Sequence, residues 1–228
     1  MRNYSKIILM SIAFVMFFSV GSVAESQGQQ LNEIYKRMQA HRNALSSLVA
    51  GIRMAQTDTV LDETDVYSGM VKYLPTKGKE AYVRIDWKKP LIETLAVANG
   101  KYVIYTPRRK QAIVGSTKDA GKGSQQNSAL AFMNMSSAEL RANYLTAYLG
   151  VEKVGGKDMW HLNMVPKKKT SYKMADLWVD GNGMPIQVKI TENNDDTKTI
   201  LLSNLQKNIT IKASDFRVDL PKGTKIIR

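Results

Sequence analysis

From about residue 46 onward, apolar side chains recur at every second position in short segments, and this period limits the possible folds more than any other feature of the chain. A period of two places alternate side chains on opposite faces of a β-strand. Many connections are short, such as Asn99-Gly100, and strands joined so closely must be antiparallel. The predicted strands are 46–56, 64–74, 80–88, 91–98, 101–106, 110–115, 151–155, 158–165, 173–180, 185–193, 197–206 and 215–219.

The segment before the strands predicts an amphipathic helix over 27–44, because its apolar residues follow helical spacing and polar residues fill the other face. The strands that follow do not alternate with helices, and a large antiparallel sheet curls to protect its edges. The sequence therefore predicts a mainly β (α+β) fold. We expect a single open, strongly curved antiparallel β-barrel of about 11–12 strands, with an N-terminal helix and a helical lid inserted in mid-sheet.

The lid is predicted from the region between the two groups of strands. A glycine-rich linker over 116–124 precedes a helical segment over 125–133. A capping box of Ser136 and Glu139 then begins a helical stripe that ends at Gly150. A helix hinged by such a linker can act as a lid, and methionine adapts to irregular apolar surfaces. The predicted lid residues are Leu130, Met133, Leu140 and Tyr144.

Each predicted strand has one apolar face, and in a curved sheet these faces converge on the inside. Such faces either fill an ordinary core or line a cavity for an apolar ligand, and the period alone does not separate the two. The helical insertion in mid-sheet favours a cavity. Its predicted wall consists of Val83, Ile85, Trp87, Trp160, Leu162, Leu177, Val179 and Val188.

The first 24 residues have the pattern of a cleaved secretory signal peptide. Arg2 and Lys6 precede a mostly apolar run over 7–20, and small residues end the segment at Ala24. A membrane anchor is the alternative, but the run is short for a span of about 20 residues. We therefore expect a cleaved signal peptide over 1–24 and one exported domain over 25–228 that acts outside the cytoplasm.

Composition narrows the chemistry further. The chain has no cysteine, so thiol nucleophiles are excluded. It has two histidines, His41 and His161, which are few residues from which to build a zinc site or a histidine-based catalytic triad. The net charge of +13 suits anionic partners such as lipid headgroups, or serves solubility alone. Export argues against nucleic acid as the partner and leaves no ATP to drive a cycle. We expect no cofactor and no metal ion.

A set of short motifs occurs in a characteristic order along the chain. They are Val83 to Trp87 before Lys89-Pro90, Asn99-Gly100-Lys101 before Tyr105 and Pro107, Leu162 to Pro166-Lys167, Asp180 to Gly183, and Phe216 to Pro221 and Gly223. In this order they resemble the motifs of the periplasmic outer-membrane lipoprotein carrier family, usually called LolA-like.

The resemblance implies an open antiparallel β-barrel covered by helices, in which Val83, Ile85 and Trp87 belong to the cavity wall. It implies a monomeric carrier, not an enzyme, that takes acylated lipoproteins from an inner-membrane exporter to an outer-membrane receptor. Proteobacterial members carry an arginine before a proline early in the sheet, and that arginine helps to hold the lid shut. Leu74 stands at this position here, before Pro75.

Several alternatives stay open at this stage. The chain could carry another envelope lipid, such as a glycolipid or a polyprenyl chain, or act as a sensor of the same fold, similar to periplasmic proteins that bind an anti-sigma factor. An envelope hydrolase would need paired carboxylates, for which Asp176, Asp180 and Glu192 are the candidates. The basic turn Arg108, Arg109 and Lys110 is a candidate docking surface, as is Lys167 to Lys169, although both could be solvated turns.

Overall fold

The computed structural model describes residues 21–76, 81–120, 132 and 135–228. These residues form one twelve-stranded sheet in the order β12-β6-β5-β4-β3-β2-β1-β11-β10-β9-β8-β7. All neighbouring strands are antiparallel except β12 and β6, which are parallel. The strands are β1 (Leu48–Asp58), β2 (Glu63–Leu74), β3 (Tyr82–Lys89), β4 (Glu93–Ala98), β5 (Lys101–Thr106), β6 (Gln111–Ser116), β7 (Tyr144–Val154), β8 (Lys157–Pro166), β9 (Tyr172–Val179), β10 (Pro185–Glu192), β11 (Thr197–Lys207) and β12 (Lys225–Ile227).

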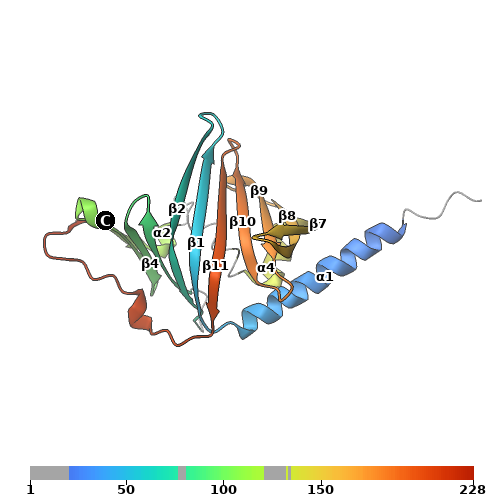
Figure 1. Cartoon of the computed structure of the whole chain (residues 1–228), viewed down its shortest axis with the longest axis horizontal. Helices are drawn as coiled ribbons and strands as arrows, with labels where there is room; N and C mark the ends of the chain where they lie inside the picture. The colour runs from blue at the N-terminus through green and yellow to red at the C-terminus, as the bar shows by residue number, and fades with distance from the viewer. Residues whose placement is uncertain (1–20, 77–80, 121–131, 133–134) are drawn as a thin grey trace, which may run out of the picture.

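The sheet curls strongly but does not close (Figure 1). Its two edges are β12 and β7, and they lie at opposite ends of the strand order. The predicted fold class, an open curved antiparallel sheet with helices against it, is confirmed. The strand arrangement follows from short hairpins, which place consecutive strands side by side.

The hairpin between β4 and β5 has the geometry that its sequence predicts. Asn99 and Gly100 both have positive φ, at 52° and 71°, as a two-residue type I′ turn requires. The turn fixes the register, with Ala98 opposite Lys101. This register places Leu95 opposite Ile104 on one face of the sheet.

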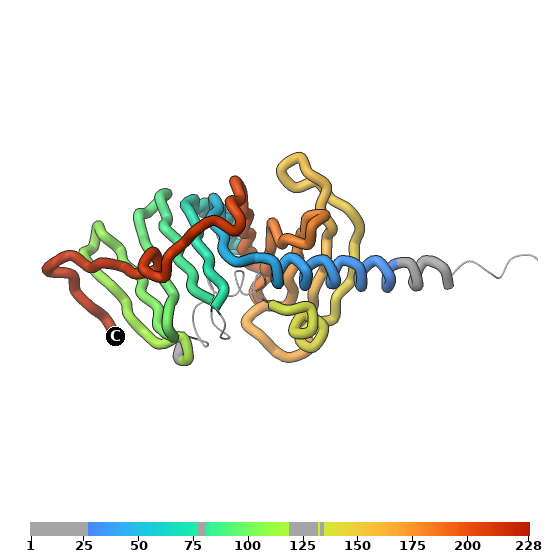
Figure 2. Tube along the Cα trace, turned by 90° about the horizontal axis from the view of Figure 1, so that it is seen from below, coloured from blue at the N-terminus to red at the C-terminus, as the bar shows by residue number. Residues whose placement is uncertain are grey.

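Helix α1 (Gly21–Ala44) ends where the sequence predicts and packs one side against the sheet. Ile34, Tyr35 and Met38 are buried, whereas Lys36 and Arg37 are exposed. Figures 1 and 2 show α1 lying across the half of the sheet formed by β7 to β11 rather than across β2 to β6. We call the face of the sheet that α1 covers the inner face, and the opposite one the outer face.

The predicted helical stripe from Ser136 to Gly150 is wrong in its second half. The capping box of Ser136 and Glu139 is present, but α4 (Ser137–Asn143) ends after two turns and Tyr144 begins β7. Leu140 and Tyr144 are four residues apart, and this spacing fits a strand as well as a helix. Pairing with β8 settles the choice, so Tyr144 is a strand residue and not part of a helical lid.

Two of the predicted lid residues, Leu130 and Met133, lie outside the described residues. Phe132 lies between them and is helical, with its side chain 1 % exposed. Its ring packs against Tyr144 at the start of β7 and Tyr172 at the start of β9, with centroids 5.4 Å and 6.4 Å apart. Phe132 thus joins the core of the sheet.

The C-terminal segment corrects a further prediction. Residues 215–219 do not form a strand; the 3₁₀-helix η2 (Ala213–Phe216) occupies the start of this segment. Phe216 is buried against Tyr82 on the outer face, with ring centroids 5.7 Å apart. The Arg84 side chain donates to the carbonyls of Asp215 and Arg217, so side-chain bonds replace a strand ladder here. Two further short helical segments are η1 (Pro107–Arg109) and α2 (Thr117–Ala120).

Candidate functional site

The inner face carries continuous rows of apolar side chains that cross the sheet. Directly paired residues on neighbouring strands point to the same face, so the register identifies each row. One row crosses seven strands from β7 to β2: Tyr148, Leu162, Leu177, Val188, Ile200, Met54 and Tyr67. A second row crosses six strands from β1 to β6: Ala50, Val71, Ile85, Leu95, Ile104 and Ile113.

All eight residues of the predicted cavity wall lie on this inner face. Trp160 pairs with Val179 beside the first row, and Val83 pairs with Tyr73 beside the second. Six of the eight are buried, whereas Val83 and Trp160 are half-buried. The structure therefore gathers the predicted residues on one surface; their role toward a ligand stays a prediction.

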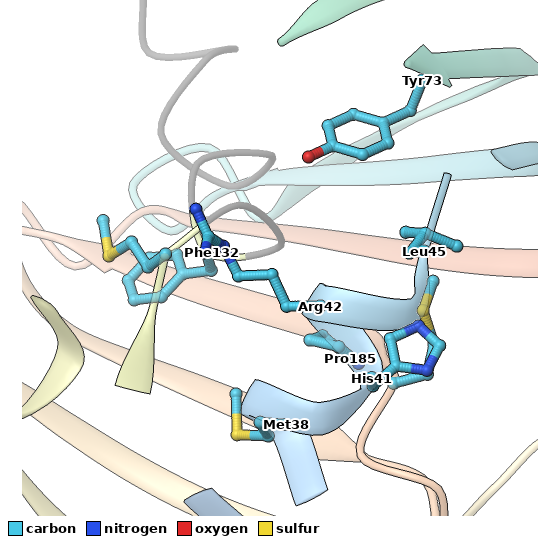
Figure 3. Close-up of a pocket in the computed structure, with 9 residues that line it drawn as sticks. Met38, His41, Arg42, Leu45, Tyr73, Phe132 and Pro185 are labelled. Carbon is cyan, nitrogen blue, oxygen red and sulfur yellow. The ribbon is translucent and has the colours of Figure 1, made fainter. Parts of the chain in front are cut away.

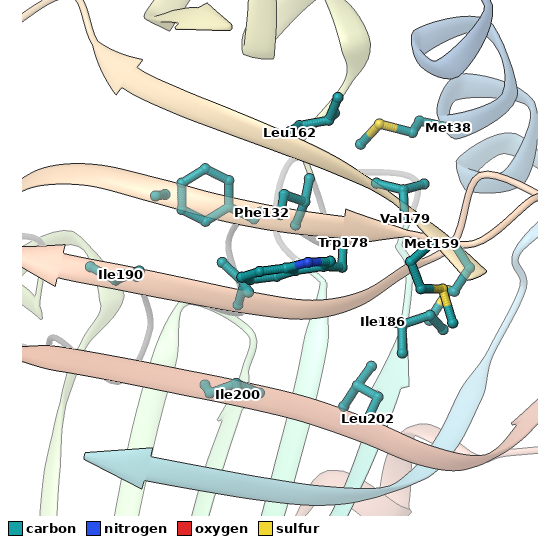
Figure 4. Packing of buried hydrophobic residues seen from close by; sticks show 14 of the residues in the cluster. Met38, Phe132, Met159, Leu162, Trp178, Val179, Ile186, Ile190, Ile200 and Leu202 are labelled. Carbon is teal, nitrogen blue, oxygen red and sulfur yellow. The ribbon is translucent and has the colours of Figure 1, made fainter. Parts of the chain in front are cut away.

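The two halves of the inner face differ in how far they are covered. Under α1, Leu162 and Leu177 are fully buried, and Figure 4 shows Met38 of α1 close to Leu162 and Val179. On β2 to β4, Val71, Ile85, Trp87 and Leu95 are buried, whereas other apolar side chains of the inner face on β2 to β5 pack against the core but are only partly buried. These are Tyr67, Tyr73, Val83, Val97 and Ile104.

Helix α1 is attached to the sheet by polar contacts as well as by packing. The Tyr35 hydroxyl donates to Thr146 Oγ1 of β7 at 2.7 Å. The Arg37 guanidinium donates to the carbonyl of Gly181 at 2.9 Å and lies over the Trp160 ring at 5.3 Å. The Arg37 bond is exposed to water, whereas the Tyr35 bond is partly buried, and together they fix the position of α1 against the sheet.

Helix α4 packs beside α1 and against the start of β7. The guanidinium of Arg141 lies 4.4 Å from the centre of the Tyr35 ring and donates to Asn32 Oδ1. The backbone N–H of Ser137 donates to Gln39 Oε1. The predicted lid residue Leu140 is fully buried in α4. The two helices therefore form one cover over the β7 side of the sheet.

A pocket opens at the C-terminal end of α1, with about 450 Å³ of empty space that includes its open mouth (Figure 3). Its lining is mostly apolar, with polar groups on one side. The lining residues are Met38, His41, Arg42, Leu45, Tyr73, Phe132, Met135, Met184 and Pro185. They come from α1 and the residue after it, β2, the segment before α4, the β9–β10 turn and the start of β10. Sequence patterns did not identify this pocket because it assembles from distant segments.

Burial dominates the electrostatics of this pocket. It lowers the pKa of His41, to which the positive charge of Lys207 adds, and it raises the pKa of the Tyr73 hydroxyl. Nε2 of His41 is buried and has no hydrogen-bond partner among the described residues. The apolar surroundings therefore favour the neutral form of His41 over the charged form.

The carboxylates proposed for a hydrolase lie in separate places. Asp176 is on the outer face, where its Oδ1 lies 3.0 Å from His161 Nε2 and accepts a hydrogen bond from Asn163. Asp180 caps the β9–β10 turn by accepting from the N–H groups of Asn182 and Met184. Glu192 pairs with Lys198 at 2.8 Å. Each carboxylate has a local structural partner.

The basic turn Arg108, Arg109 and Lys110 is exposed at the end of β5, with Arg108 and Arg109 in η1. Lys110 takes the left-handed conformation that ends η1, with φ of 47°.

No described helix is long and apolar enough to cross a membrane. The described residues also contain no group of three or more acidic or histidine side chains placed to hold a metal ion.

Comparison with protein families gives one match. Residues 79–219, more than half of the chain, match the family described as outer membrane lipoprotein carrier protein LolA. The match covers β3 to η2 and therefore most of the inner face. No curated protein sequence is similar to the chain at a significant level.

Two solved structures with TM-scores above 0.5 share the fold at low sequence identity. An uncharacterized conserved protein from Thermus thermophilus is 11 % identical with a TM-score of 0.56, covering 88 % of this chain and 99 % of that one. MucB, from Pseudomonas aeruginosa, is 11 % identical with a TM-score of 0.55, covering 84 % of this chain and 63 % of its own. A LolA superfamily protein from Nitrosomonas europaea is 15 % identical with a TM-score of 0.41, covering 82 % and 97 %.

Proposed function

Since the chain belongs to the outer membrane lipoprotein carrier (LolA) family, we propose that it is an exported carrier that holds the acyl chains of lipoproteins against its inner face. It moves them through the periplasm toward the outer membrane. No bond is made or broken in this process, so the protein is a binding protein and not an enzyme.

The observation that supports this proposal is the uneven cover of the inner face. The apolar rows extend beyond α1 onto β2 to β5, where Val83 and Ile104 stay half-buried. Exposed apolar surface of this kind is typical of ligand grooves. An acyl chain laid along the rows would bury the same side chains that face water in the free protein.

The energetics of an acyl chain explain why such a surface is needed. Each exposed CH₂ costs about 0.8 kcal/mol in water, so a chain of about 16 carbons costs over ~10 kcal/mol. Release must occur without ATP, and therefore the net affinity has to stay moderate. Helices α1 and α4 compete with the ligand for the apolar surface near the pocket, and this competition lowers the affinity.

Displacement of a fluorescent acyl probe tests the proposal. Val83→Glu introduces a charge on the half-buried part of the inner face and should weaken probe binding at least about tenfold. Val66→Glu is the matched control, because Val66 is 40 % exposed on the opposite face of β2. It should bind the probe like the unaltered protein, and circular dichroism should report the same sheet content for both variants.

Mass spectrometry of molecules that co-purify with the protein from native envelopes identifies the cargo. Acylated lipoproteins support the carrier role proposed here. A free glycolipid or polyprenyl lipid would point to another envelope lipid as the cargo. Failure of every acyl ligand to bind, together with no co-purifying lipid, would contradict the proposal.

A further inference from the structure

Two adjacent aliphatic residues are exposed in the loop between β3 and β4. Leu91 is 46 % exposed and Ile92 is 65 % exposed. Single exposed aliphatic residues are common on proteins. Here, however, the pair follows two exposed lysines, Lys88 and Lys89, so apolar and cationic groups share one short loop.

The basic turn between β5 and β6 lies at the same end of the sheet. Glu93 at the start of β4 accepts a hydrogen bond from Thr106 at the end of β5, so the two connections leave the sheet side by side. Three strand spacings separate β3 from β6, about 14 Å. The exposed cations Arg108, Arg109 and Lys110 therefore lie at the same end of the sheet as the aliphatic pair, about three strand spacings away.

The C-terminal segment adds charge beside this turn. The N–H of Lys225 donates to the carbonyl of Lys110 at 2.8 Å, and Lys222 is exposed in the preceding turn. We call the β3–β4 loop and the cations around it the basic corner. It comprises Lys88, Lys89, Leu91, Ile92, Arg108, Arg109, Lys110, Lys222 and Lys225.

Glu93 of β4 and Asp86 of β3 are the acidic residues of these strands next to the basic corner, and Glu93 accepts a hydrogen bond from Thr106. Asp86 forms an ion pair with Arg84 at 2.9 Å and accepts from Thr94. None of the salt bridges found among the described residues involves a cation of the basic corner. The corner therefore presents seven positive charges, which the adjacent carboxylate of Glu93 offsets only in part.

The hairpin between β1 and β2 provides a contrast within the same molecule. Its tip exposes Val60 and Leu61, at 85 % and 65 %. Asp58, Asp62 and Glu63 flank this pair, so the tip is acidic. It rises at the top of Figure 1. Strand β2 begins at Glu63, five residues before Ser68, which pairs with the last residue of β3, so the hairpin extends about 17 Å beyond the end of β3.

We propose that the basic corner is a docking site for an anionic phospholipid surface. Leu91 and Ile92 enter the headgroup region while the surrounding lysines and arginines bind lipid phosphates. Aliphatic residues flanked by cations are the combination that binds anionic membranes, whereas an acidic tip is repelled by them. The proposal deepens the carrier function by giving it a membrane contact, but it does not depend on the protein holding cargo.

Vesicle flotation tests the docking site with protein purified from envelopes of cells that express the full chain. The protein should bind vesicles of phosphatidylcholine and phosphatidylglycerol and not vesicles of phosphatidylcholine alone. Binding should weaken as salt is raised, because salt screens the attraction. Equal binding to both vesicle types, or no binding to either, would overturn the proposal.

Matched variants assign the binding to the corner. Leu91→Ser with Ile92→Ser should weaken binding to anionic vesicles about tenfold. Arg108→Ser with Arg109→Ser should weaken it about 30-fold at low salt. Val60→Ser with Leu61→Ser removes the same kind of side chains from the acidic hairpin and should leave binding unchanged. A loss of equal size in this control would overturn the assignment to the corner.

The acyl-probe assay separates this proposal from the carrier function. The corner variants change exposed loops outside the inner face, so they should bind the probe like the unaltered protein. If the protein binds anionic vesicles through the corner but binds no acyl probe, the carrier function alone is contradicted. If it binds the probe but no vesicles, the docking site alone is contradicted.

Discussion

Gly183, in the turn between β9 and β10, lies directly against the backbone of Arg37 in helix α1. A Cβ atom at Gly183 would lie 2.3 Å from both the carbonyl carbon and the carbonyl oxygen of Arg37. Gly183 also has a φ of 86°, which disfavours any residue with a side chain. This contact sets how closely α1 approaches the sheet.

Gly183→Ala should therefore lower the stability of the fold and loosen α1. The steric contact and the positive φ together should cost about 1–3 kcal/mol of the free energy of unfolding, because neither backbone can yield freely. With α1 displaced, more of the inner face becomes accessible. We expect a lower Tm together with stronger fluorescence of a hydrophobic dye.

Gly181→Ala is the control for this experiment. Gly181 lies in the same turn, a Cβ atom added to it would have nothing within 4 Å, and it bonds to Arg37 through its backbone carbonyl alone. This substitution should leave Tm and dye fluorescence close to those of the unaltered protein. Equal effects of the two substitutions would show that turn flexibility, and not the contact with α1, controls exposure of the inner face.

His41 should make stability depend on pH in the weakly acidic range. Burial, and secondarily Lys207, holds its folded-state pKa below the ordinary value of 6.5. Below that value the unfolded chain binds a proton that the folded chain does not, so the free energy of unfolding falls as the pH decreases. Urea denaturation of the protein and of His41→Gln, at about pH 7.5 and about pH 5.5, measures this contribution.

The His41→Gln variant should lose less stability than the unaltered protein between these two pH values. An unchanged difference would mean that His41 is protonated in the folded state, which would contradict the apolar environment described for the pocket. The substitution also leaves Arg42 and Tyr73 in place, so the pocket keeps its other polar groups.

The period-two pattern predicted the sheet because each strand is half buried and its neighbours are joined by short turns. Asn99-Gly100 fixes one hairpin by local chemistry alone, since both residues tolerate positive φ. The alternation of apolar and polar residues likewise predicts that Ile85 and Leu177 point to the inside of the curved sheet, without any information on which strands pair. These features depend on residues close together in the sequence, which is why sequence patterns reach them.

The features that sequence patterns missed depend on distant pairing. Strand β12 is three residues long and acquires its structure by lying parallel to β6, more than 100 residues earlier in the chain. Tyr144 has neighbours at a spacing of four that fit either period, and only β8 decides for a strand. The pocket around His41 likewise requires α1, β2 and the β9–β10 turn to meet.

The second apolar row should contribute more to stability at its centre than at its edge. Ile85 is 2 % exposed in β3, whereas Ile113 in the same row is 38 % exposed in β6. Ile85→Ala should cost about 2–5 kcal/mol of the free energy of unfolding, because it leaves a cavity among packed side chains. Ile113→Ala should cost less than about 1 kcal/mol. Similar losses in urea denaturation would mean that the row does not pack as described.

The C-terminal segment should detach from the outer face without unfolding the sheet. Its attachment rests on the Phe216 ring against Tyr82 and on Arg84, which donates to the carbonyls of Asp215 and Arg217. Phe216→Ala removes the only contact of this set that buries apolar area. We expect faster amide exchange over residues 212–219 and tryptic cleavage near Arg217, while amide exchange in β8 to β11 stays slow.

Ile226→Ala serves as the comparison for this last prediction. Ile226 lies in β12 of the same segment but is 50 % exposed, so its truncation should change neither exchange nor cleavage. If Phe216→Ala instead accelerates exchange throughout the sheet, the segment is part of the cooperative core. In that case the outer face of β3 and β4 stabilises the curved sheet directly, and Arg84→Met should lower Tm to a similar extent.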